Sequence, residues 1–174
     1  MEYNVSHLLK SFVGETREYD IDPTELVLDD ETTAMIDGGH VRFDRTNSGL
    51  LARGHADATV SLTCARCLDP VAEPLRVEFT EEFEPTVDVA TGRPLPASEN
   101  ELAFPIDEHH ILDLGEALRQ NLLAVLPIAP LCQSDCAGLC PVCGTNRNTD
   151  PCGHVVDDAN HPLAGLAELL RETS

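Results

Sequence analysis

The 174-residue sequence contains no tryptophan, only 4% aromatic residues and a single lysine, Lys10. Because 42% of its residues are apolar, a hydrophobic core can form, but it must consist mostly of leucine, valine and alanine. No apolar run approaches the roughly 20 residues that a membrane-spanning helix needs. The amino terminus also lacks the basic-then-apolar pattern of a signal peptide. We therefore expect a cytoplasmic protein with no membrane partner.

Sequence patterns of common catalytic sites are missing as well. The chain has no glycine-rich phosphate loop and no nucleophile elbow. It also has no cluster of acidic metal ligands and no paired acid and base of the kind that a nuclease uses. These absences argue against an enzyme and against a small-molecule substrate, so we expect a non-enzymatic protein.

The charge is strongly one-sided, with a formal net charge of −20 at pH 7. Such a surface repels phosphate groups, which disfavours simple electrostatic binding of RNA or DNA. It suits a basic partner such as a ribosomal protein. High solubility and adaptation to a salty environment are equally good explanations of the same charge.

In one stretch, between His40 and Cys67, basic residues outnumber acidic ones. Its four arginines are the best candidates for direct contact with RNA phosphates, although arginines on strands more often form a solvated face. They are Arg42, Arg45, Arg53 and Arg66.

Alternation of apolar and polar residues predicts strands through the first eighty-odd residues. The clearest segment runs from Leu50 to Cys64, with small or apolar residues at even positions. It is expected to form a hairpin with residues 41–45. Shorter segments of the same kind lie at 13–21, 26–28 and 75–83. The sequence therefore predicts an antiparallel sheet or small barrel over residues 1–83.

The chain after residue 83 lacks the alternating pattern of the first part. Residues 84–108 are rich in proline and acidic residues, which predicts a linker or long loop. A helix is expected to begin at Asp113, with Glu116 completing a capping box, and to end before Pro127. Leucines at 163, 166, 169 and 170 predict a short terminal helix. The overall expectation is an α+β chain in which residues 109–174 combine a helix with a small zinc-knuckle unit.

Four of the seven cysteines lie within twelve residues, at Cys132, Cys136, Cys140 and Cys143. In the run Cys-Pro-Val-Cys-Gly that begins at Cys140, two thiolates two residues apart can turn onto one ion, and the glycine permits the tight turn. In a reducing cytosol such spacing indicates metal binding rather than disulfides. Because zinc prefers four tetrahedral sulfur or nitrogen ligands, these four cysteines are predicted to form one structural zinc site.

Other assignments of the ligands remain open. Cys152 or His154 could replace one of the upstream cysteines. The runner-up metal centre is an iron–sulfur cluster, because Cys136, Cys140 and Cys143 have the spacing of enzymes that bind such a cluster together with S-adenosylmethionine. Those enzymes are large barrels with the motif early in the chain, whereas here it lies late.

Cys64 and Cys67 form another pair with a two-residue gap. Redox pairs of this spacing sit at a turn from a strand into a helix, whereas here a strand is expected to follow. Two reduced thiols packed near the sheet edge are therefore favoured over redox chemistry, and a joint metal site with the later cysteines is possible.

Three blocks of the sequence resemble the YceD family, the large ribosomal RNA subunit accumulation proteins. The first is Cys-Ala-Arg-Cys-Leu-Asp-Pro, beginning at Cys64. The second is Leu-Pro-Ile-Ala-Pro-Leu-Cys, ending at Cys132, and the third is the cysteine-rich stretch 135–148. Two positions depart from the family pattern. His154 stands where the tail often has a second cysteine, and Asn-His-Pro at 160–162 stands where Asp-Pro-Arg is common.

The resemblance implies a role in the accumulation or processing of large-subunit ribosomal RNA. Together with the cysteine spacing, it predicts a non-enzymatic ribosome-biogenesis factor with a structural zinc. The implied partner is a basic ribosomal protein or a precursor of the large-subunit ribosomal RNA. The alternatives are a generic zinc-binding adaptor for other proteins and an RNA-processing or redox enzyme.

Overall fold

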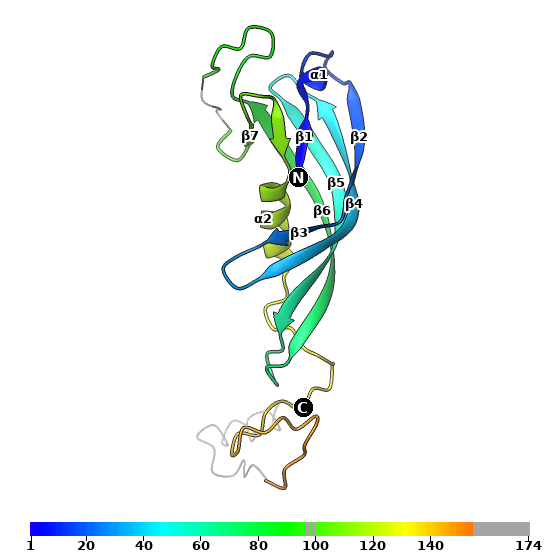
Figure 1. Cartoon of the computed structure of the whole chain (residues 1–174), viewed down its shortest axis with the longest axis vertical. Coiled ribbons are helices and arrows are strands. Elements are labelled where there is room, and N and C mark those ends of the chain that lie inside the picture. The colour runs from blue at the N-terminus through cyan, green and yellow to red at the C-terminus, as the bar shows by residue number, and fades with distance from the viewer. Residues whose placement is uncertain (97, 99, 155–174) are drawn as a thin grey trace, which may run out of the picture. The chain divides into compact units, whose positions relative to one another are not determined.

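The structure is a computed structural model that describes residues 1–96, 98 and 100–154 (Figure 1). The chain divides into two compact units. Unit 1 comprises Met1–Leu62 and Ala72–Ile128, and unit 2 comprises Thr63–Val71 and the chain from Ala129 onward. No helix within the described residues has the length and apolar composition to cross a membrane.

These boundaries differ from the predicted ones at 1–83, 84–108 and 109–174. The proline-rich stretch 84–108 lies within unit 1. Its ends are joined by a hydrogen bond from the Thr86 amide to the Ile106 carbonyl, 3.1 Å long, and the Leu95 amide donates to the Thr86 carbonyl at 2.9 Å. The helix expected in the C-terminal unit also belongs to unit 1, whereas Thr63–Val71 leaves the predicted β domain for unit 2.

Unit 1 is organised around one eight-stranded sheet with the strand order β1-β8-β7-β6-β5-β4-β2, and β3 pairs with β4 beside this path. The pairs β1–β8, β2–β4, β3–β4, β4–β5 and β7–β8 are antiparallel, whereas β6 and β7 are parallel. In chain order, the elements are β1 Glu2–Asn4, α1 Ser6–Leu9, β2 Thr16–Ile21, β3 Thr24–Val27, β4 Thr33–Arg45, β5 Leu50–Thr63, β6 Pro70–Pro85, β7 Phe104–Ile106, β8 Ile111–Asp113 and α2 Gly115–Val125.

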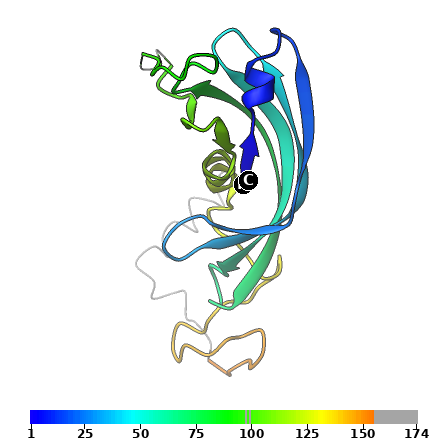
Figure 2. The same ribbon diagram turned by 45° about the horizontal axis from the view of Figure 1, so that its top comes forward.

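The fold is mostly β, and the sheet curls into a half-barrel with α2 on its concave side (Figure 2). The predicted hairpin is confirmed, since Val41 pairs with Gly54 and Arg45 with Leu50. β4 is longer than expected and begins at Thr33. β1, β7 and β8 were not predicted, because each has three residues and is too short to show an alternating pattern.

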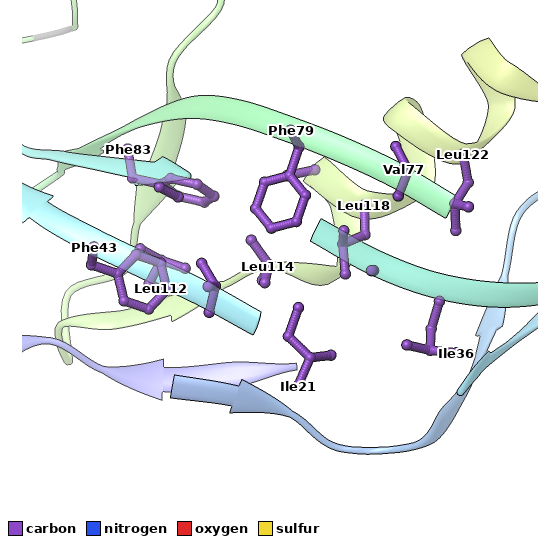
Figure 3. Packing of buried hydrophobic residues seen from close by; sticks show 14 of the residues in the cluster. Ile21, Ile36, Phe43, Val77, Phe79, Phe83, Leu112, Leu114, Leu118 and Leu122 are labelled. Atoms are coloured by element: carbon purple, nitrogen blue, oxygen red, sulfur yellow. The ribbon is translucent and has the colours of Figure 1, made fainter. Parts of the chain in front are cut away.

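The core of unit 1 lies between the curled sheet and α2. Figure 3 shows side chains of the sheet and of α2 converging there, among them Phe43, Phe79 and Phe83. From the helix side, Leu114, Leu118 and Leu122 are each fully buried, along the apolar stripe expected for this helix. Even-numbered residues of β5 face the same core, which confirms the alternation expected for that strand.

The start of α2 differs from the prediction. Asp113 ends β8, and α2 begins at Gly115. The Asp113 carboxylate accepts hydrogen bonds from the Gly115 amide at 2.9 Å and from the Met1 amino group at 3.1 Å. Glu116 does not close a capping box, because its carboxylate binds Arg119 at 2.7 Å. The predicted terminal helix at residues 163–170 lies outside the described residues.

Candidate metal centres

The cysteines and His154 form two groups of four ligands within unit 2, and in each group all ligand atoms lie within 4.8 Å of one another. The first metal cluster consists of Cys64, Cys67, Cys132 and Cys136. The second metal cluster consists of Cys140, Cys143, Cys152 and His154.

The spacing of the sulfurs in the first metal cluster fits a tetrahedral ion. The Cys64 and Cys136 sulfurs are 3.8 Å apart, and those of Cys67 and Cys132 are 3.6 Å apart. A disulfide would bring two sulfurs to about 2.05 Å. Zinc–sulfur bonds of about 2.3 Å in a tetrahedron separate neighbouring sulfurs by about 3.8 Å. The donor set and its dimensions therefore suit one zinc ion.

A tight turn between β5 and β6 presents the first two of these thiols. The Cys64 amide donates to the Asp69 carbonyl at 2.8 Å, and the Leu68 amide donates to the Cys64 carbonyl at 3.0 Å. Leu68 has a φ of 64° to close this turn, a left-handed conformation that is uncommon for a bulky residue. The resulting knuckle points Cys64 and Cys67 into the buried side of unit 2, where both sulfurs meet their partners.

Polar side chains also contact the first metal cluster at Cys136. Arg66 donates through Nη1 to the Cys136 carbonyl at 3.0 Å. The Asn148 amide nitrogen lies 3.3 Å from the Cys136 sulfur, and its oxygen accepts from the Ala137 amide at 2.8 Å. Hydrogen bonds of this kind orient metal ligands and tune their basicity.

Gly138 shows how closely the chain packs beside the first knuckle. Its φ is 69°, and a Cβ on it would lie 3.1 Å from the Arg66 carbonyl oxygen. The next residue, Leu139, donates its amide to that same carbonyl at 3.0 Å. This approach brings the segment between Cys136 and Cys140 against the Cys64–Asp69 turn, and these two cysteines belong to different metal clusters.

The environment of three cysteines, Cys64, Cys140 and Cys143, lowers the pKa and so favours the thiolate that a metal requires. The backbone amide of Cys67 lowers the pKa of the Cys64 thiol to about 6 against the opposing effect of burial, and the Arg66 amide adds to this. Hydrogen bonds from the Thr145 hydroxyl and amide lower the pKa of Cys143 to about 6. For Cys67, the Asp69 amide lowers the pKa, but burial and hydrogen bonding with the neighbouring thiols raise it overall.

The structure divides the four predicted ligands between the two clusters, so the single four-cysteine site is not the grouping observed. Cys132 and Cys136 join Cys64 and Cys67, which had been favoured as free thiols. The three cysteines with iron–sulfur spacing are divided in the same way, because Cys136 lies apart from the other two. Whether these residues bind metal stays a prediction. One sequence signal could have indicated the pairing, since eight candidate ligands are what two tetrahedral ions need.

The four arginines proposed for RNA contact all make internal contacts. Arg42 and Arg53 both donate to the buried Asp44 carboxylate, through their Nε atoms at 2.7 Å and 3.1 Å. Arg45 donates to backbone carbonyls, including that of Gly49 at 2.9 Å, and Arg66 binds the Cys136 carbonyl. Arg42 and Arg53 nevertheless remain about half exposed, and Arg45 and Arg66 bind uncharged carbonyls, so the structure does not remove these arginines from consideration.

A sequence model described as "Large ribosomal RNA subunit accumulation protein YceD" matches residues 52–170, which span both halves of the first metal cluster and the whole second cluster. The chain belongs to the YceD family. This match bears out the resemblance drawn from the three sequence blocks, and it links unit 2 to a family whose description concerns large-subunit ribosomal RNA.

Relatives within the curated proteins are mycobacterial. Uncharacterized proteins of Mycobacterium bovis and Mycobacterium tuberculosis are each 34% identical over 130 residues, which is 75% of this YceD chain and 60% of theirs. An uncharacterized protein of Mycobacterium leprae is 28% identical over 130 residues, 75% of this chain and 57% of its own length. The chain thus spans somewhat more than half of the curated relatives that it matches. No solved structure matches it.

Proposed function

We propose that this YceD protein is a non-enzymatic factor that supports the accumulation or processing of large-subunit ribosomal RNA, and that a structural zinc at the first metal cluster holds its unit 2 together. The family description carries the ribosomal part of the proposal. The four convergent thiols at Cys64, Cys67, Cys132 and Cys136 carry the zinc part.

Several observations favour a structural ion. Three of the four cysteines in the first metal cluster are buried, and they form the centre of the small buried cluster of unit 2, against which Val71 and Leu131 pack. Four protein ligands complete a tetrahedron and leave no position for a substrate, unlike catalytic zinc sites, which keep one open. An iron–sulfur cluster would place its own iron and sulfide atoms between the thiolates, whereas sulfurs within 4.8 Å of one another suit a single ion.

The charge of the chain favours a basic protein as the direct partner. At −20, the surface attracts lysine- and arginine-rich ribosomal proteins and repels naked RNA. The arginine stretch does not offset this, because the net charge of −20 already includes its four arginines. We therefore propose that its direct partner is a basic protein of the large subunit or of its precursor, met in the cytoplasm. This association is expected to weaken with salt, because screening shortens the reach of surface charges.

The test is a depletion strain of the source organism, analysed for the ratio of large- to small-subunit ribosomal RNA and for subunit peaks on sucrose gradients. We expect less large-subunit RNA, restored by the wild-type chain but not by a Cys64→Ser, Cys67→Ser variant. Pull-downs with the purified chain should recover a basic large-subunit protein at low salt and lose it at high salt. Normal subunit ratios without a ribosomal protein in the pull-down would overturn the proposal in favour of an adaptor with other partners.

A further inference from the structure

The second metal cluster lies outside the site invoked above, and its ligands come from a short part of the chain. Cys140 and Cys143 lie at one end of this stretch, and Cys152 and His154 at the other. The Cys140 sulfur lies 3.8 Å from His154 Nδ1. A tetrahedral zinc with sulfur and nitrogen ligands at about 2.3 Å and 2.05 Å would separate these two atoms by about 3.6 Å. The dimensions of the second cluster therefore suit one ion as well.

The two clusters are built on the same local turn. In the first, the Cys64 amide donates to the carbonyl of Asp69, five residues later, and the Leu68 amide donates to the Cys64 carbonyl. Leu68 has a φ of 64°. In the second, the Cys140 amide binds the Thr145 carbonyl at 2.8 Å, and the Gly144 amide binds the Cys140 carbonyl at 2.8 Å. Gly144 has a φ of 74°. Each turn carries two cysteines separated by two residues, and their thiols face two further ligands from another part of the chain.

From this repeated geometry we propose that the chain binds two zinc ions, the second at Cys140, Cys143, Cys152 and His154. The second site differs from the first in its ligands, three thiolates and an imidazole, and in its exposure. Only Cys140 is buried among its four ligands, whereas Cys143 and His154 are exposed. The second ion should therefore exchange faster with a chelator than the first. This inference needs no ribosomal role for the protein.

The second ion should also support the first. Residues 144–151 form a loop whose two ends carry the second set of ligands. This loop contains Asn148, which contacts the Cys136 sulfur of the first cluster at 3.3 Å, and Asn146, which donates to Asp69 Oδ2 at 2.6 Å. Closing the loop with a metal holds both asparagines in place. Zinc at the second site is thus expected to slow the release of zinc from the first.

Native mass spectrometry of the full chain, purified without a metal-affinity step, measures the number of ions directly. We expect two zinc ions per chain, and one in a Cys143→Ser, Cys152→Ser variant. Addition of a chelator should remove one ion quickly and the other slowly, and the variant should release its single ion faster than the wild type releases its slow one. A single ion in the wild type, or two ions in the variant, would overturn the proposal.

A conservative variant tests the ligand set even if the double variant folds poorly. His154→Cys keeps four ligands at the second site but makes them all thiolates. In the cadmium-loaded protein, cadmium NMR should give two resonances, of which one moves in His154→Cys and the other does not. His109→Ala, which changes an exposed histidine in unit 1, is the matched control and should move neither. Unchanged resonances in His154→Cys would remove His154 from the site.

Asn148→Ala tests the link between the sites. Both ions should remain bound at saturating zinc, while zinc affinity at the first site falls by about 10- to 100-fold, the usual effect of losing a residue that orients metal ligands. Asn47→Ala, at an exposed turn of unit 1, should leave the affinity unchanged. An unchanged affinity in Asn148→Ala would show that Asn148 does not link the two sites.

Discussion

At the scale of single residues, Asp44 stands out as a buried carboxylate of unit 1, 8% exposed and paired with two arginines. Burial would raise its pKa, but hydrogen bonds from Arg53 and Arg42 lower the pKa overall. The arginines remain about half exposed, so part of this interaction is screened by water. Asp44 therefore joins neighbouring strands β4 and β5 through one shared charge.

We expect Asp44→Asn to lower the free energy of unfolding by about 1–2 kcal/mol near pH 7, the lower part of the range for hydrogen bonds to charged groups, because water screens the half-exposed arginines. Because the folded pKa lies below the unfolded value of about 3.9, this contribution is present above pH 4 and disappears as the pH falls through the folded pKa. The difference between wild type and variant should shrink accordingly in acid.

Urea unfolding followed by tyrosine fluorescence measures this, because the chain has no tryptophan and both tyrosines, Tyr3 and Tyr19, lie in unit 1 with ring centres 5.1 Å apart. Asp57→Asn is the control, since the pair between Asp57 and Arg76 is about half exposed on both sides. It should change stability by less than about 1 kcal/mol. A pH-independent effect of Asp44→Asn would contradict the charge-based explanation.

At the scale of elements, α2 is too short to be stable alone. An isolated helix of 11 residues is marginal in water, so packing must supply its stability. Its buried stripe fills the concave side of the sheet (Figures 2 and 3). Arg119 adds a polar tie by donating to the Leu28 carbonyl at 3.0 Å. The sheet and α2 thus bury each other's apolar side chains in one shared core.

Leu118→Ala should lower the free energy of unfolding by about 2–5 kcal/mol, because the fully buried side chain leaves a cavity between α2 and the sheet. Val125→Ala on the same helix is the control. Val125 is 44% exposed, and alanine favours helix more than valine does, so this change should cost less than about 1 kcal/mol. Equal effects of the two substitutions in urea unfolding would show that the stripe does not anchor the helix.

At the scale of the whole molecule, the two units depend on different forces. Unit 1 has a continuous apolar core, whereas the buried cluster of unit 2, within the described residues, is made of Cys64, Cys67 and Cys136. Structural zinc contributes on the order of 10–16 kcal/mol of apparent binding free energy in small peptide sites. Such a contribution is large compared with what so few apolar contacts provide, so unit 2 should depend on metal and unit 1 should not.

A chelator at neutral pH is therefore expected to unfold unit 2 and leave unit 1 intact. Hydrogen exchange should show lost protection of the Leu139, Cys140 and Gly144 amides, while the tyrosine signal and the β-sheet circular dichroism stay unchanged. Restored protection after adding zinc back serves as the control. Loss of both units together, or of neither, would contradict the assignment of separate stabilising forces.

Much of unit 1 could be predicted from local patterns. The alternation along β5, the hairpin with β4 and the apolar stripe of α2 are periodic, and periodicity is visible in any single sequence. The parallel pairing of β7 with β6 produces no periodic pattern in the sequence. β7 has three residues within a proline-rich stretch, and its partner lies about twenty residues earlier in the chain. Only the assembled sheet, in which β7 lies between β6 and β8, gives that stretch its position.

The same division applies to the metal ligands. By itself, the sequence determined the family and the residues that are candidate metal ligands, because the cysteine spacing, Gly144 and the family blocks are all properties of neighbouring residues. The tertiary structure alone decided which ligands meet. Cys132 and Cys136 join Cys64 and Cys67, some 70 residues earlier in the chain, and Cys140 and Cys143 join Cys152 and His154. A metal ion selects ligands by distance in space, and the hydrogen bond from Leu139 to Arg66 turns the chain between the two sets.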